Sequence, residues 1–127
     1  GFTEWTHVGD PAFDELAYDE YRAATELLTS RGARMLWMLA AHQDRPLAPM
    51  TDPARIDRLN EIVADVAATV PNTSLVDYPS WLADVSSRLD RQLRRDGLHL
   101  SDDGIAEVVP WLADDVLGSV VPVRTSS

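Results

Sequence analysis

An acid and an imidazole stand three residues apart near the end of this chain, at Asp96 and His99. A carboxylate that accepts the Nδ1 proton of a histidine fixes the tautomer of the ring and leaves Nε2 free to take a proton from a serine hydroxyl. The pair therefore predicts the base half of a serine hydrolase site. The local sequence favours equally a solvated turn in which Asp96 and Ser101 only compete to cap the next helix.

The residues around this pair are suited to hold it. Gly97 permits a tight turn that brings Asp96 back under the imidazole, and Ser101 is a good N-cap for the helix that follows. That helix is predicted from an apolar stripe that would form one face. Its members are Ile105, Val108, Val109, Leu112, Val116 and Leu117.

Upstream, helices and strands alternate. The pairs Asp10-Pro11 and Asp52-Pro53 each supply an N-cap and a proline at the first helical position, and they predict helices that run to Gly32 and to Val70. Buried strands are predicted over Met35–Ala40 and Thr73–Tyr78, closed by Pro79. A shorter helix is expected from about Ser80 to Leu89. Residues 1–9 and 41–50 are expected to be loops.

This alternation of helices and strands is typical of parallel strands joined by helical crossovers. It predicts the α/β fold class, within a three-layer arrangement. A parallel sheet of only two strands is rarely stable alone, because parallel strands need both faces covered and neighbouring strands at their edges. The chain therefore has the pattern of one portion, residues 1–127, of a single doubly wound domain whose first strands lie elsewhere.

The composition of the chain excludes several classes of binding partner and site. The 127 residues carry a formal net charge of -10, which disfavours binding to nucleic acid or to an anionic membrane surface. The chain has no cysteine, so disulfides and thiolate metal sites are excluded, and no His, Asp and Glu set has metal-ligand spacing. No apolar run is long enough to insert into a membrane. No cofactor is expected.

The block Asp96-Gly97-Leu98-His99-Leu100-Ser101, followed by Gly104 and an amphipathic helix, resembles the last motif block of the SGNH (GDSL-like) hydrolases. Further similarity to the C-terminal half of that family is carried by Arg55, Leu59, Asn60 and Leu75-Val76-Asp77. The opening Val8-Gly9-Asp10-Pro11-Ala12-Phe13-Asp14 is similar to SGNH domains attached to actinobacterial membrane acyltransferases.

The resemblance implies a flavodoxin-like α/β/α fold and an esterase or acyltransferase activity with a serine nucleophile. His99 would be the general base and Asp96 the residue that orients it. The family's Gly-Asp-Ser, oxyanion-hole and Gly-x-Asn-Asp blocks belong on the first three strands and are not found here. Gly9-Asp10 is followed by Pro11 rather than serine, so it is interpreted as a helix cap.

This departure leaves three explanations: a split or nicked enzyme, a truncated chain, or a degenerate relative. The first two are favoured, since Gly1 would lie in a loop beyond the third strand. The expected partner is the N-terminal half of the same domain, and the expected substrate is an ester or an acylated carbohydrate. The acyltransferase-linked domains imply a location at the cell envelope.

Other side chains have weaker claims. His42 follows the first strand and is a candidate substrate contact, although a loop histidine is more often solvated. Trp37 is expected in the core, and Trp81 and Trp111 between helix and sheet. Arg88, Arg91, Arg94 and Arg95 are expected to form a solvated or paired face, with anion recruitment as the alternative. A non-catalytic glycan- or protein-binding module is the alternative function for the whole chain.

Overall fold

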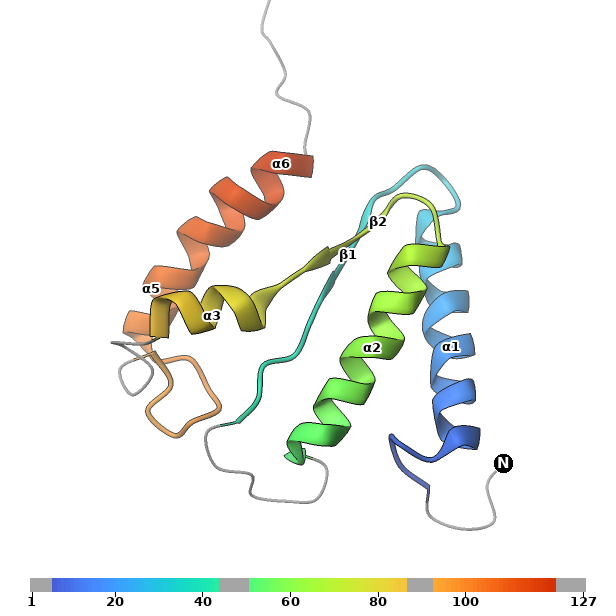
Figure 1. Cartoon of the computed structure of the whole chain (residues 1–127). Helices are drawn as coiled ribbons and strands as arrows, with labels where there is room; N and C mark the ends of the chain where they lie inside the picture. The colour runs from blue at the N-terminus through green and yellow to red at the C-terminus, as the bar shows by residue number, and fades with distance from the viewer. Residues whose placement is uncertain (1–5, 44–50, 87–92, 121–127) are drawn as a thin grey trace, which may run out of the picture. The chain divides into compact units, whose positions relative to one another are not determined.

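A computed structural model describes residues 6–43, 51–86 and 93–120 of the chain. These residues divide into two compact units, Gly1–Ser80 and Trp81–Ser127, and each unit is described by itself. The elements follow one another in the order shown in Figure 1. The predicted α/β class is confirmed in its coarse form: the elements are mostly helices, with one parallel sheet of two strands.

The first unit holds helix α1 (Pro11–Thr29), strand β1 (Met35–Met38), helix α2 (Pro53–Thr69) and strand β2 (Thr73–Val76). The strands pair in parallel, from Met35 opposite Thr73 to Met38 opposite Val76. Helices α1 and α2 pack side by side, and both contact the sheet, α1 through β1 and α2 through β2 (Figure 1). This is the predicted crossover between parallel strands.

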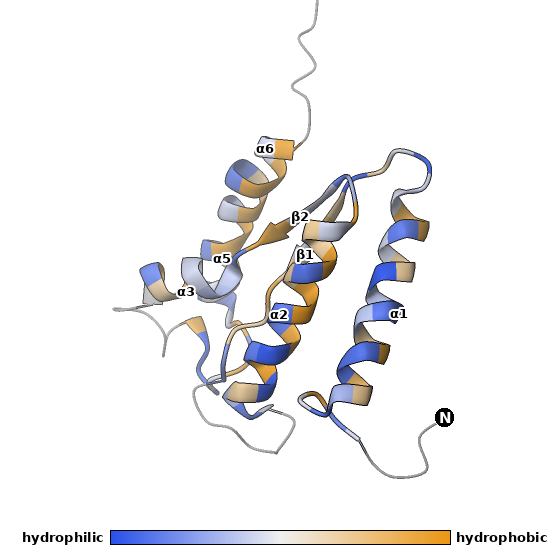
Figure 2. Ribbon diagram, turned by 45° about the vertical axis from the view of Figure 1, so that its right-hand side comes forward, coloured by the Kyte–Doolittle hydropathy of each residue, from blue (hydrophilic) through white to orange (hydrophobic). Residues whose placement is uncertain are grey.

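The core of this unit is built mainly by α2. Ile62, Val63 and Val66 are buried along one side of the helix, and the polar and apolar residues of α2 separate on different sides (Figure 2). Thr25 of α1 is fully buried and accepts a 3.0 Å hydrogen bond from the indole Nε1 of Trp37. Trp37 therefore packs against α1, but its side chain is only half-buried, so the prediction of a core residue holds only in part.

The two Asp-Pro signatures begin both helices, but only one of the two aspartates caps with its side chain. Asp52 Oδ1 accepts the Ala54 amide at 2.8 Å, as predicted. The Asp10 side chain makes no cap bond; its Oδ2 accepts the His7 amide at 3.0 Å instead. Asp10 is thus the N-cap residue of α1, as predicted, but the preceding turn takes its carboxylate.

Both strands are shorter and more exposed than predicted. β1 ends at Met38, whose side chain is exposed, and β2 ends at Val76 with Ser74 and Leu75 exposed. Tyr78 begins helix α3 (Tyr78–Ser86) rather than ending a strand, because Asp77 Oδ1 accepts the Ser80 amide at 3.1 Å and so starts the helix. The predicted loop tip at 44–50 and the helix end at 87–89 lie outside the described residues.

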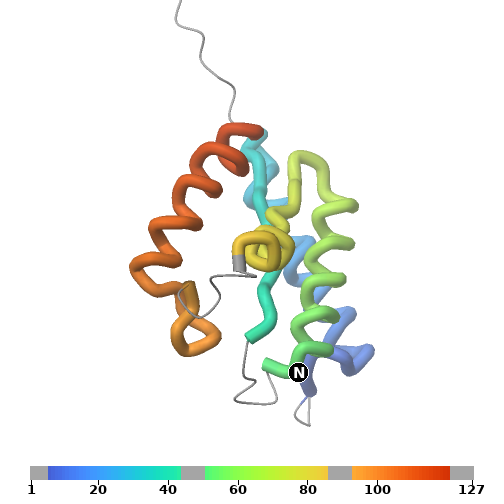
Figure 3. Tube along the Cα trace, turned by 60° about the vertical axis from the view of Figure 1, so that its left-hand side comes forward, coloured from blue at the N-terminus to red at the C-terminus, as the bar shows by residue number. Residues whose placement is uncertain are grey.

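The second unit contains most of α3 and a helical run in three segments: α5 (Asp102–Pro110), the wider π-helical η2 (Trp111–Leu117) and the short α6 (Gly118–Val120). Figure 3 shows this run as one continuous rod. Pro110 lacks an amide hydrogen, which explains why the regular α-helix ends there and the wider turns follow.

Burial in this unit differs from the predicted stripe. Only Val108 of the six stripe residues is buried, and it joins Leu82 and Leu93 in the core. Ile105, Val109 and Leu117 are exposed. Trp81 and Trp111, which were expected between helix and sheet, stack on each other with ring centroids 4.8 Å apart.

Candidate functional site

The candidate site lies in a short turn that precedes α5. Gly97 has a φ of 76°, in the left-handed region that glycine adopts without strain, and its amide donates to the Arg94 carbonyl at 2.9 Å. The chain therefore reverses directly after Asp96. This reversal returns the next two amides and the His99 ring to the Asp96 carboxylate, as the Asp-Gly spacing predicts.

Both oxygens of the Asp96 carboxylate are used. Oδ1 accepts the amides of Leu98 at 2.9 Å and His99 at 2.7 Å, and Oδ2 lies 2.7 Å from His99 Nδ1. The hydrogen bond from the His99 ring is the main cause that holds the pKa of Asp96 well below its usual range, and the two amides lower it further. Asp96 is therefore an anion at any pH near neutrality.

His99 is oriented by this carboxylate and faces solvent. An ionised carboxylate only accepts hydrogen bonds, so its contact places the ring proton on Nδ1 and leaves the lone pair on Nε2. The side chain of His99 is 77% exposed. The arrangement can accept a proton at Nε2 from a hydroxyl brought to it, and Asp96 would stabilise the imidazolium that results.

Helix α5 is anchored to the same turn. Ser101 is the N-cap of α5, and its hydroxyl oxygen accepts the Gly104 amide at 3.1 Å. The Ser101 amide in turn donates to the carbonyl of the buried Leu93 at 2.7 Å. The predicted cap is confirmed. Ser101 joins α5 to the turn, because its hydroxyl binds the first turn of the helix and its amide binds Leu93.

Gly104 lets the helix approach this closely. A Cβ at position 104 would lie 2.5 Å from the Leu93 carbonyl oxygen and 3.1 Å from Leu93 Cα. Backbone atoms cannot give way as a flexible side chain can, so any larger residue would push α5 away from the turn. The glycine three residues after Ser101 is therefore required by packing.

An open pocket of about 480 Å³ lies beside the imidazole. Six of its seven lining residues are polar or charged, and Leu100 is the apolar exception. The polar members are Arg95, Asp96, His99, Ser101, Asp102 and Asp103.

His42, the predicted substrate contact, is held by a residue that sequence reasoning missed. Its Nε2 lies 2.6 Å from Oδ1 of Asp57 in α2, and both side chains are at least half exposed. The segment after β1 is fixed nearby, since the Asn60 side chain accepts the Ala40 amide and donates to the Ala40 carbonyl, each at 2.9 Å. No pattern in the sequence marks a pair separated by fifteen residues. His42 belongs to the first unit and His99 to the second.

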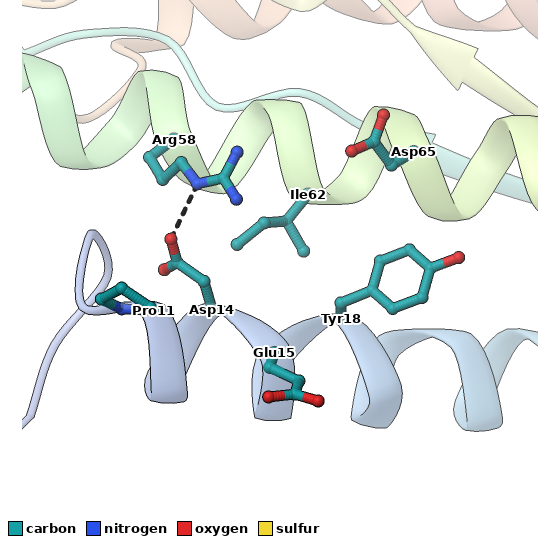
Figure 4. Close-up of a pocket in the computed structure, with 7 residues that line it drawn as sticks. All are labelled: Pro11, Asp14, Glu15, Tyr18, Arg58, Ile62 and Asp65. Carbon is teal, nitrogen blue, oxygen red and sulfur yellow. Dashed lines mark hydrogen bonds and ion pairs between the residues drawn. The ribbon is translucent and has the colours of Figure 1, made fainter.

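A second pocket lies between α1 and α2 in the first unit (Figure 4). At its end Arg58 Nε donates to Oδ2 of the buried Asp14 at 2.8 Å, and Asp14 Oδ1 accepts the Gly9 amide at 2.8 Å. The Arg58 hydrogen bond is the largest cause that lowers the pKa of Asp14, followed by the Gly9 amide. This pair ties the start of α1 to α2, so its role is structural.

Two further observations concern ligands and membranes. Among the described residues no group of three or more metal-ligating side chains gathers. Within the same part of the chain, none of the helices has the length and apolar character that crossing a bilayer requires.

Comparison of the chain with protein-family models, with curated proteins and with solved structures found no match.

Proposed function

We propose that this chain is the C-terminal part of a serine esterase or acyltransferase domain of SGNH type, with a flavodoxin-like three-layer fold. Its Asp96 and His99 would complete a catalytic triad whose serine and oxyanion donors lie on a separate N-terminal segment. The observation that carries the proposal is the 2.7 Å contact from Asp96 Oδ2 to His99 Nδ1, combined with the exposure of the ring. His42 is proposed as a substrate contact.

The Asp96 carboxylate supports the assignment because it is fully committed to positioning. Three donors from its own turn hold it, so the imidazole is fixed in tautomer and direction before any substrate arrives. A solvated turn that only caps a helix would not need this, since Ser101 already caps α5. Preorganisation of this kind is what a general base requires.

The chemistry then follows in two steps. His99 Nε2 takes the proton of the serine hydroxyl as its oxygen attacks the ester carbonyl, and the imidazolium returns that proton to the leaving alcohol. In the second step His99 removes a proton from water, or from an acceptor hydroxyl, whose oxygen attacks the carbonyl of the acyl-enzyme. The bond from that carbonyl to the serine oxygen then breaks, and the imidazolium returns the proton to the serine. Asp96 stays ionised throughout and stabilises the imidazolium.

The test uses the chain together with its N-terminal segment. A fluorophosphonate probe should label a serine of that segment, and His99→Ala should slow both labelling and ester turnover by at least about a thousandfold. His7→Ala is the matched control, because His7 also lies beside an aspartate but at 3.8 Å and outside the pocket. Denaturing mass spectrometry of the purified material identifies the segment. Unchanged turnover in His99→Ala would refute the assignment, and absent labelling would favour a binding module.

A further inference from the structure

Two adjacent arginines in the candidate site have different surroundings. Arg94 is 8% exposed and belongs to the core of its unit, whereas Arg95 is exposed and lines the pocket that contains His99. The sequence groups the two in one basic cluster, so only the structure separates them. Arg95 is therefore a cationic side chain that lines the same pocket as the candidate base.

The guanidinium of Arg95 has no carboxylate partner among the residues that the structure describes, although Asp102 and Asp103 line the same pocket. The carboxylate of Asp96 is occupied by the His99 ring and two amides. The chain has 21 acidic and 11 basic residues, yet Arg95 pairs with none of the acidic residues that the structure describes. Its guanidinium is therefore available to a ligand in the pocket that His99 also lines.

We propose that Arg95 binds an anionic oxygen group, such as a carboxylate, on the substrate whose ester bond His99 serves. The inference rests on the proposed function, and it names the class of substrate. The planar guanidinium presents paired N–H donors that match the two oxygens of a carboxylate. Asp102 and Asp103 line the same pocket and repel an anion, so Arg95 is the lining residue whose charge attracts it.

The first test measures binding to the 127-residue chain itself. Monomethyl succinate carries an ester and a carboxylate, and dimethyl succinate is its neutral counterpart. Titration followed by amide NMR should show that the anionic ester shifts the His99 and Leu100 signals at lower concentration than the neutral one. Arg95→Gln should remove this preference, which is about fivefold for one exposed charge pair. Arg34→Gln, at an exposed arginine of the first unit, should preserve it.

The second test measures turnover of the same esters by the chain with its N-terminal segment. The ratio of kcat/KM for the anionic ester to that for the neutral ester should fall about fivefold in Arg95→Gln, mainly through KM. Arg95-dependent binding without any turnover would retain the anion site and refute the proposed function. Three outcomes would overturn the inference. The complex could turn over both esters with no preference for the anionic one, or Arg95→Gln could retain that preference. The third outcome is a stronger preference for the cationic methyl ester of β-alanine.

Discussion

Asp96 divides its two oxygens between the backbone and the imidazole. Oδ1 holds two amides of its own turn, and Oδ2 holds His99 Nδ1, so the same side chain that shapes the turn also orients the ring. This is why a spacing of three residues suffices to build the pair. The sequence predicted the contact because every participant is local. It did not predict the contact of His42 with Asp57, because the two residues are fifteen positions apart and Asp57 belongs to helix α2.

Replacing Asp96 by asparagine should invert the tautomer of His99. An asparagine amide can donate to Nδ1, which then accepts, and the ring proton moves to Nε2 and abolishes the base. Nitrogen NMR of the His99 ring near neutral pH measures this: the parent should show a protonated Nδ1 and the variant a protonated Nε2. Asp57→Asn changes the partner of His42 and should leave the His99 signals alone. A protonated Nδ1 in Asp96→Asn would contradict the role given to Asp96.

At the scale of elements, the helix starts were predictable and the burial of the strands was not. Asp-Pro signals act within one turn, so both helices begin where expected. Whether a strand is buried depends on what covers it, and an apolar run such as Met35 to Ala40 carries no information about its cover. Leu75 and Met38 therefore proved exposed despite their apolar side chains.

The link between α1 and α2 should make stability depend on pH. The pKa of Asp14 is lowered in the folded state, so its contribution is present above the ordinary carboxyl range and is lost as pH falls through the depressed value. Asp14→Asn should reduce the free energy of unfolding by about 1 kcal/mol near neutral pH. Urea unfolding of parent and variant measures this difference, which should shrink as pH falls below the ordinary carboxyl range.

A matched variant separates this link from a general charge effect. Glu61 is the other partner of Arg58, and its side chain is 64% exposed. Glu61→Gln should therefore cost less than Asp14→Asn. A stability difference for Asp14→Asn that stays constant from neutral to acid pH would show that the carboxylate charge has no part in the link.

At the scale of the whole molecule, the alternation of elements predicted the α/β class, since the parallel crossover follows from order alone. The flavodoxin-like arrangement stays a prediction. The fold also bears on the strands that we propose lie on an N-terminal segment, because α1 and α2 contact the same sheet and each other. Crossovers on one face of a parallel sheet advance in one direction. We therefore expect a strand that leads into α1 to pair with β1, on the edge away from β2.

Hydrogen exchange tests this expectation. In a parallel ladder alternate residues face opposite edges, and Met35 and Leu39 donate toward β2, to Asn72 and Val76. In the chain alone, the amides of Leu36 and Met38 should therefore exchange about tenfold or more faster than the amides of Met35 and Leu39. When the N-terminal segment binds, the amides of Leu36 and Met38 should become protected. Fast exchange at Leu36 and Met38 in an active complex would place that segment elsewhere.

The contact at Gly104 has a mechanical consequence. Because the Leu93 carbonyl occupies the space where a side chain would stand, and because that carbonyl also accepts the Ser101 amide, the start of α5 cannot slide along the turn without breaking both contacts. The turn and the start of α5 should therefore move together as one rigid piece. A displacement of the start of α5 would therefore also move the turn that holds His99.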